Sequence, residues 1–268
     1  MKFATFPKFA LMSLMAGVLA LILTGCGAVA NNPEALTQGN WSMAATSNGS
    51  AGTFNIGGSL TQSGSSLAGT MYVVGSCIST SEQVAFTGSV SGNNITLASS
   101  GGSGQVITLS LTGTASSLTG TYSVNGGCDT GDSGTVVATP VASVTGTWNA
   151  PILNDGAGDP NVTLSMALTQ ATTPSANGTF ALTGTLTYTG STCEASGTIS
   201  SASIAGPYLV INANTVDSDS STGSITYTQG LLNSASTPTS MTGTYNVISD
   251  GGNLPCSGDL ATVTFTKQ

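Results

Sequence analysis

Charged side chains are scarce in this sequence of 268 residues, which has 3 Lys and Arg, 11 Asp and Glu, and no His. Only 5% of the chain is charged, whereas average soluble domains reach roughly 25%. This scarcity excludes coiled coils, helical bundles with charged faces and charged disordered tails. The net charge of −8 argues against a nucleic-acid surface, because phosphate binding needs clustered basic side chains. We therefore expect no nucleic-acid partner.

The missing side chains also narrow the chemistry open to the chain. Without His or Arg, and with Lys267 as the only basic residue beyond position 25, most acid–base and phosphate chemistries lack their usual participants. The nearest carboxylate pair, Asp129 and Asp132, is a conceivable glycosidase-like acid and base. The more ordinary interpretation is a turn whose carboxylates accept backbone hydrogen bonds. We predict that the protein is not an enzyme and uses no cofactor.

The N-terminus has the pattern of a bacterial export signal. Lys2 and Lys8 are followed by an apolar run over residues 9–23. This run is shorter than the roughly 20 residues that span a bilayer. The segment ends in Leu23-Thr24-Gly25-Cys26, which resembles the lipobox of bacterial lipoproteins. The resemblance implies cleavage before Cys26, attachment of diacylglycerol to its sulfur and acylation of the new N-terminus. The alternative is an ordinary signal peptide that happens to contain a cysteine.

The same resemblance predicts a location for the protein. Two kinds of acyl attachment on Cys26 would anchor the chain stably, so the expected partner is a membrane, reached through the lipid. Gly27 rather than Asp follows the cysteine, which in bacteria with two membranes is similar to lipoproteins sorted to the outer membrane. We therefore expect a signal peptide over 1–25, a lipidated tether over 26–38 and a site in the cell envelope, at the outer membrane.

The rest of the sequence is an internal duplication. Several short motifs recur in the same order, and the second copy is longer only through loop insertions. The matching segments are Gly39-Asn-Trp41 with Gly146-Thr-Trp148, Leu60-Thr-Gln62 with Leu168-Thr-Gln170, and Leu118-Thr-Gly-Thr-Tyr122 with Met241-Thr-Gly-Thr-Tyr245. These matches predict one repeat over 39–139, a linker over 140–145 and a second repeat over 146–268.

Each repeat reads as a series of short β-strands, because apolar and small polar residues alternate with period two. We expect about eight strands per copy, separated by Gly-, Asn- and Ser-rich turns. The fold class is therefore all-β, with two tandem homologous antiparallel meander units that each close into a small up-and-down barrel. A β-sandwich is the alternative. The expected strands lie near 41–45, 53–61, 67–74, 83–90, 94–98, 106–112, 117–124 and 133–139, and near 145–150, 162–169, 179–189, 194–200, 207–212, 223–230, 241–248 and 258–266.

Four cysteines remain after Cys26, two in each repeat. The duplication selects the disulfides Cys77–Cys128 and Cys193–Cys256 among the three possible pairings. Each pair falls in the third-to-fourth and seventh-to-eighth strand connections, which lie at the same end of a meander. A zinc site is not supported, because no Cys-x-x-Cys spacing and no His are present.

Gly-x-Trp at the first strand of each repeat resembles the lipocalin and avidin families of small barrels, and Leu-Thr-Gly-Thr-Tyr is similar to avidins. The resemblance covers fragments only, so no ligand-contacting residue can be transferred from either family. A Trp that plugs one end of the barrel is the competing explanation. Bulky inward residues would favour a filled interior, and we expect these to be Trp41, Phe54, Tyr72, Phe86 and Tyr122.

Three Asp-rich loops are conceivable sites for a hard cation, although none has the spacing of an EF-hand. They are Asn154–Asp159, Asp217–Asp219 and Asp129–Asp132. Such turns are common without any metal, so we predict no metal site. The function that these observations favour is a non-catalytic cell-envelope lipoprotein that displays two β-domains as a binding or structural module. The alternatives are a lipocalin-like carrier of a small apolar ligand and, more distantly, a carboxylate-based hydrolase.

Overall fold

A computed structural model describes residues 36, 38–49, 52–75, 78–152, 159, 161–217, 220–249 and 260–268 of the chain. All regular structure among these residues is β-strand. No helix in this part of the chain is long and apolar enough to span a membrane. The strands form two closed antiparallel barrels in which each strand pairs with its neighbours in sequence.

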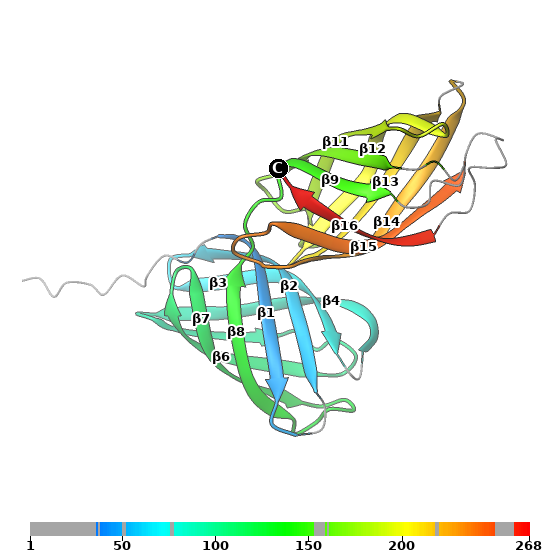
Figure 1. Ribbon diagram of the computed structural model, residues 1–268. Helices are drawn as coiled ribbons and strands as arrows, with labels where there is room; N and C mark the ends of the chain where they lie inside the picture. The colour runs from blue at the N-terminus through cyan, green and yellow to red at the C-terminus, as the bar shows by residue number, and fades with distance from the viewer. Residues whose placement is uncertain are drawn as a thin grey trace, which may run out of the picture. The chain divides into compact units, whose positions relative to one another are not determined.

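Barrel 1 is the eight-stranded meander of the first repeat, drawn from blue to green in Figure 1, and it closes by pairing of β1 with β8. Its strands are β1 (Gly39–Ser47), β2 (Thr53–Ser63), β3 (Ser66–Gly75), β4 (Ile78–Ser91), β5 (Asn94–Ser99), β6 (Val106–Thr114), β7 (Ser117–Asn125) and β8 (Ser133–Pro140).

Barrel 2 repeats this architecture, and it closes by pairing of β16 with β9 (Figure 1). Its strands are β9 (Gly146–Ile152), β10 (Val162–Gln170), β11 (Phe180–Thr189), β12 (Glu194–Ala205), β13 (Tyr208–Asp217), β14 (Thr222–Leu232), β15 (Ser240–Ser249) and β16 (Leu260–Lys267).

Each barrel encloses its own core, because the alternation in the strands sends apolar side chains inward and Ser and Thr outward. In β6, for example, Ile107, Leu109 and Leu111 are buried while the residues between them are exposed. The two cores are separate clusters of buried residues. Large side chains occupy both interiors, including Trp41 and Phe86 in barrel 1 and Trp148 and Phe265 in barrel 2.

The recurring Leu-x-Gly motifs have a structural explanation in the strand register. Gly69, Gly120 and Gly184 occupy inward positions, each directly opposite a buried leucine of the preceding strand. A Cβ atom at Gly120 would lie 2.0 Å from the carbonyl oxygen of Ser110, and one at Gly69 would lie 2.3 Å from that of Ser59. Only glycine allows neighbouring strands to approach this closely where the sheet curves. The motifs shared by the two repeats are therefore requirements of barrel curvature.

The expected fold class is confirmed, and closure of both barrels excludes the sandwich alternative. All sixteen strands lie where the alternation placed them, although several are longer than expected, such as β1 and β4. The inward placement of Tyr72 was wrong. Met71 and Val73 are the buried residues of this part of β3, and Tyr72 is only partly buried between them. Because four apolar residues follow one another from Met71, the phase of the alternation is ambiguous there.

One buried polar contact links the two repeats within residues 33–268. The Asn40 side chain is 5% exposed, and its Nδ2 donates to the carbonyl oxygen of Gly206 at 2.9 Å. The amide N–H of Gly206 donates in return to Asn40 Oδ1 at 2.6 Å. Both hydrogen-bonding groups of the Asn40 amide are thus paired with the backbone of one residue, Gly206, in the β12–β13 turn.

Candidate functional site

Of the predicted site residues, the structure describes only Cys128 and Cys193. Cys26, Cys77 and Cys256 lie outside the described residues. Cys128 follows β7 and Cys193 precedes β12, so each lies in a connection at the predicted end of its meander. Cys193 is 1% exposed, and Gln105 Nε2 donates to Cys128 Sγ at 3.8 Å. The two pairings, Cys77–Cys128 and Cys193–Cys256, stay predictions.

The two tryptophans that carry the lipocalin and avidin resemblance are fully buried. The indole Nε1–H of Trp148 donates to the carbonyl oxygen of Val144 at 2.8 Å. Lys267 Nζ lies 5.3 Å from the centroid of the Trp148 ring and donates to the carbonyl oxygen of Ser143. The only basic residue beyond position 25 is therefore engaged beside the tryptophan of barrel 2.

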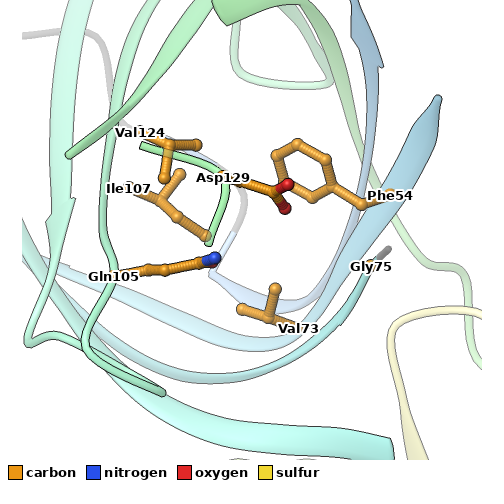
Figure 2. A pocket seen from close by; sticks show the side chains of 7 residues that line it. All are labelled: Phe54, Val73, Gly75, Gln105, Ile107, Val124 and Asp129. Carbon is orange, nitrogen blue, oxygen red and sulfur yellow. The ribbon is translucent and has the colours of Figure 1, made fainter. Parts of the chain in front are cut away.

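The interior of barrel 1 contains a small cavity at the opposite end from its tryptophan. It has a volume of about 10 Å³, which leaves room for about one water molecule. Figure 2 shows Phe54, Val73, Ile107 and Val124 around it, with the carboxylate of Asp129 directed toward the same space. Such a cavity does not accommodate an organic ligand.

A tyrosine, a carboxylate and a serine form a hydrogen-bonded group near this end of barrel 1. The Tyr122 hydroxyl donates to Asp132 Oδ2 at 2.7 Å, and the Ser47 hydroxyl donates to Asp132 Oδ1 at 2.5 Å. Burial and the bond to Asp132 raise the pKa of Tyr122 to about 12. Burial alone would raise the pKa of Asp132, but hydrogen bonds from Ser47, Tyr122 and the Ser133 backbone hold it below its usual value.

The hydrogen bonds of Asp132 show how Asp129 and Asp132, the conceivable acid and base of the sequence analysis, are arranged. Both oxygens of Asp132 accept hydrogen bonds, and the amide of Asp132 donates to the carbonyl oxygen of Asp129, which closes a turn. Asp129 instead borders the small cavity. The two carboxylates thus belong to a turn between β7 and β8, and they do not face each other across a cleft.

Barrel 2 carries a different polar group in its interior. Tyr245 occupies the position in the duplicated motif that Tyr122 occupies in barrel 1. Its hydroxyl donates to Glu194 Oε2 at 3.1 Å and lies 3.2 Å from the hydroxyl of Tyr188. Tyr245 is completely buried, Glu194 is 2% exposed and Tyr188 is 7% exposed. Burial raises the pKa of both tyrosines well above the ordinary value, and the negative charge of Glu194 adds to the rise in each.

A second carboxylate lies beside Glu194. Asp217 is 4% exposed and directly opposite Glu194 in the pairing of β12 with β13. The Ser221 hydroxyl donates to Asp217 Oδ2 at 2.8 Å. Thr215 occupies the inward position before Asp217 on β13 and is 1% exposed. The interior of barrel 2 thus holds two buried carboxylates, two phenol hydroxyls and a threonine hydroxyl.

The Asp-rich loops are described only in part. Asp159 Oδ2 accepts hydrogen bonds from the backbone amide and the hydroxyl of Thr192, both at 2.6 Å. All of 154–158 and of 218–219 lies outside the described residues. In the described part of the chain, no group of three or more His, Cys, Asp or Glu side chains is arranged to hold a metal ion.

The sequence analysis missed the group inside barrel 2, although one signal could have found it. The alternation that buries Leu209, Ile211 and Ala213 continues without a break to Thr215 and Asp217. Extending the inward phase past the last apolar residue would have placed both polar side chains in the barrel. The sequence-based expectation instead places Asp217 in an Asp-rich loop over 217–219.

The outer wall of barrel 2 has an open groove of about 400 Å³ beside the irregular pairing of β14 with β15. It is lined mostly by polar residues, and Leu231 within it is 44% exposed.

No protein-family model matches this chain, and no curated protein or solved structure shows significant similarity to it.

Proposed function

We propose that the protein is a non-catalytic lipoprotein of the cell envelope that displays two β-barrels from a membrane. The anchor is the lipid on Cys26, and the lipobox-like segment over residues 23–26 is its support. A short tether over 27–38 connects the lipid to the first strand. In bacteria with two membranes, Gly27 supports an outer-membrane location.

The observation that carries the display function is the packing of the barrels. Trp41, Phe86, Trp148 and Phe265 are completely buried in the two cores, and the cavity in barrel 1 has room for about one water molecule. Binding by such barrels falls to their loops and outer walls, because the interior is filled. This packing favours a display or structural module over a carrier of a small apolar ligand.

The polar groups of barrel 1 lend no support to hydrolysis. Asp132 is held by Ser47 and Tyr122 within a turn, and its carboxylate is not opposed by a second one across a cleft.

The proposed disulfides, one in each repeat, would tie the strand connections at one end of each barrel. Such bridges form readily in an oxidising envelope compartment.

Fractionation and lipid labelling test the anchor directly. In a bacterial host, the wild-type chain should incorporate labelled palmitate and sediment with membranes, whereas Cys26→Ala should lose the label. Thr24→Ala is the matched control, because it keeps a small residue next to the cleavage site and should leave labelling unchanged. Absence of label from the wild-type chain, or label that persists in Cys26→Ala, would contradict the proposal.

Native mass spectrometry tests the display function separately. The purified chain should show the mass of the processed, lipidated polypeptide alone. A small apolar molecule that co-purifies in a fixed ratio would favour the carrier alternative.

A further inference from the structure

Barrel 2 buries two neighbouring carboxylates in its interior. Glu194 and Asp217 face each other across β12 and β13, and at most 4% of either is exposed. Directly paired residues on one face of a sheet have Cβ atoms about 4.5–5.5 Å apart, so these two acids are close neighbours. Two negative charges at this separation in a protein interior are strongly unfavourable unless something neutralises them.

The chain has few positively charged side chains that could neutralise these carboxylates. It contains only three basic side chains, Lys2, Lys8 and Lys267, and no His or Arg. Lys267 is engaged with Trp148 and Ser143. Lys2 and Lys8 belong to the segment that the proposed processing removes. Neutralisation must therefore come from outside the chain.

Oxygen atoms near the two acids lack hydrogen-bond donors. Asp217 accepts a bond from Ser221 on Oδ2, but its buried Oδ1 has no hydrogen-bond partner. The buried hydroxyl of Thr215 has none either. Thr215 and Asp217 are successive inward residues of β13, so both project into the same part of the barrel. An unmet hydroxyl beside an unmet carboxylate oxygen is a costly arrangement for an empty interior.

The equivalent region of barrel 1 shows what a self-sufficient arrangement looks like. There the duplicated tyrosine, Tyr122, donates to Asp132, and both oxygens of that carboxylate accept side-chain hydrogen bonds. In barrel 2 the same tyrosine position donates to Glu194, and Asp217 lies directly opposite that acid. Asp129 and Asp132 of barrel 1 are only partly buried, whereas Glu194 and Asp217 are at most 4% exposed, so the difference lies in the burial of the two charges.

We propose that this region of barrel 2 binds a hard divalent cation, Ca²⁺, through the carboxylates of Glu194 and Asp217 and the hydroxyl of Thr215. Calcium prefers oxygen ligands, and water molecules complete its coordination in many protein sites. A divalent ion neutralises both charges and also uses the Thr215 oxygen. The exclusion of Lys2 and Lys8 rests on the proposed processing, whereas the three ligands of the site do not involve the lipid anchor.

Calcium titration of the purified full-length mature chain tests the site. After treatment with a chelator, CaCl₂ should give a saturable heat signal with one site per chain and should raise the melting temperature by several degrees. Affinity in the range of extracellular calcium modules, with a Kd of about 10⁻⁴–10⁻³ M, is sufficient for this shift. Magnesium should bind more weakly, because it requires a stricter octahedral geometry.

Two variants at the site and one matched control locate the binding. Asp217→Asn removes a charge at constant shape and should abolish both signals. Thr215→Val removes only the hydroxyl and should weaken binding at least several-fold, which keeps the test informative if Asp217→Asn does not fold. Asp132→Asn makes the same chemical change in barrel 1 and should bind calcium as the wild-type chain does.

Three outcomes would overturn the proposal. The first is a wild-type chain whose titration shows neither heat nor a melting shift. The second is calcium binding that survives both site variants at wild-type affinity, which would place the ion elsewhere. The third is calcium binding that Asp132→Asn abolishes, which would place the ion in barrel 1.

Discussion

Replacement of Gly120 by alanine should destabilise barrel 1 through a steric conflict with the backbone of β6. An added Cβ would lie 2.0 Å from the carbonyl oxygen of Ser110 and 2.9 Å from the Cα of Leu111. Both atoms belong to the backbone of β6, so no side chain can rotate away to relieve the contact. The strands must separate at this point, which weakens the β6–β7 hydrogen bonds around the register pair of Gly120 and Leu111.

The size of the effect follows from two opposing contributions. Overpacking a well-fitted interior costs about 1–3 kcal/mol. Replacing glycine by alanine also restricts the unfolded chain, which stabilises the fold by about 0.4–1 kcal/mol. We expect Gly120→Ala to lower the free energy of unfolding by about 1–2 kcal/mol, equivalent to roughly 4–15 °C in melting temperature for a domain of about 100 residues.

Gly49→Ala is the matched control, because it makes the same change in the same barrel without the conflict. A Cβ at Gly49 would meet its nearest neighbour, Ser47 Oγ, at 3.5 Å, which is ordinary van der Waals contact. This variant should be as stable as the wild-type chain or slightly more so. Urea unfolding followed by circular dichroism and by the fluorescence of the buried tryptophans measures both variants. If Gly120→Ala unfolds at the same urea concentration as Gly49→Ala, the explanation of the Leu-x-Gly motifs is wrong.

Three further predictions follow from the barrels. Peptide mapping without reduction should find one disulfide inside each repeat, and a bridge between the repeats would contradict the duplicated pairing. Asp132→Asn should be less stable than the wild-type chain at pH 7 and lose this difference as the pH falls below about 4. The hydrogen bonds from Ser47 and Tyr122 lower the pKa of Asp132 in the folded chain, so they stabilise only its ionised form. A series of urea titrations at different pH values measures this change in stability. Asn40→Ala leaves the buried N–H and carbonyl of Gly206 without partners, so unfolding should become easier by about 2–5 kcal/mol and the two repeats should melt at more widely separated temperatures by calorimetry.

The fold was predictable because one simple periodicity controls it. A strand that faces a filled interior must alternate, and the alternation in segments such as Val106–Thr112 is unbroken. The duplication then allowed the same strands to be predicted a second time from the other copy. Tyr72 shows the limit of the method. Where apolar residues are consecutive, the sequence pattern does not determine which of them face inward. In β3 the register with β2 and β4 determines the inward residues.

The polar interior of barrel 2 was less accessible for a different physical reason. Sequence patterns treat charged residues as exposed, because burying an unbalanced charge is costly. Glu194 and Asp217 violate that expectation, and their burial depends on pairing between two strands that the sequence alone does not align. Asn40 was missed for a similar reason, since its partner Gly206 is 166 positions away in the chain.

The two repeats share what their barrels need and differ in what surrounds one tyrosine. The glycine opposite leucine and the tryptophan near the first strand occur in both copies, and each has a structural role that curvature or core packing explains. The tyrosine of the Thr-Gly-Thr-Tyr motif also occurs in both, yet its carboxylate partner comes from the β7–β8 turn in barrel 1 and from β12 in barrel 2. Glu194 and Asp217 are buried at this end of barrel 2, whereas Asp129 and Asp132 of barrel 1 are only partly buried. The shared motifs therefore account for the architecture of both barrels, and the buried acids distinguish the interior of barrel 2.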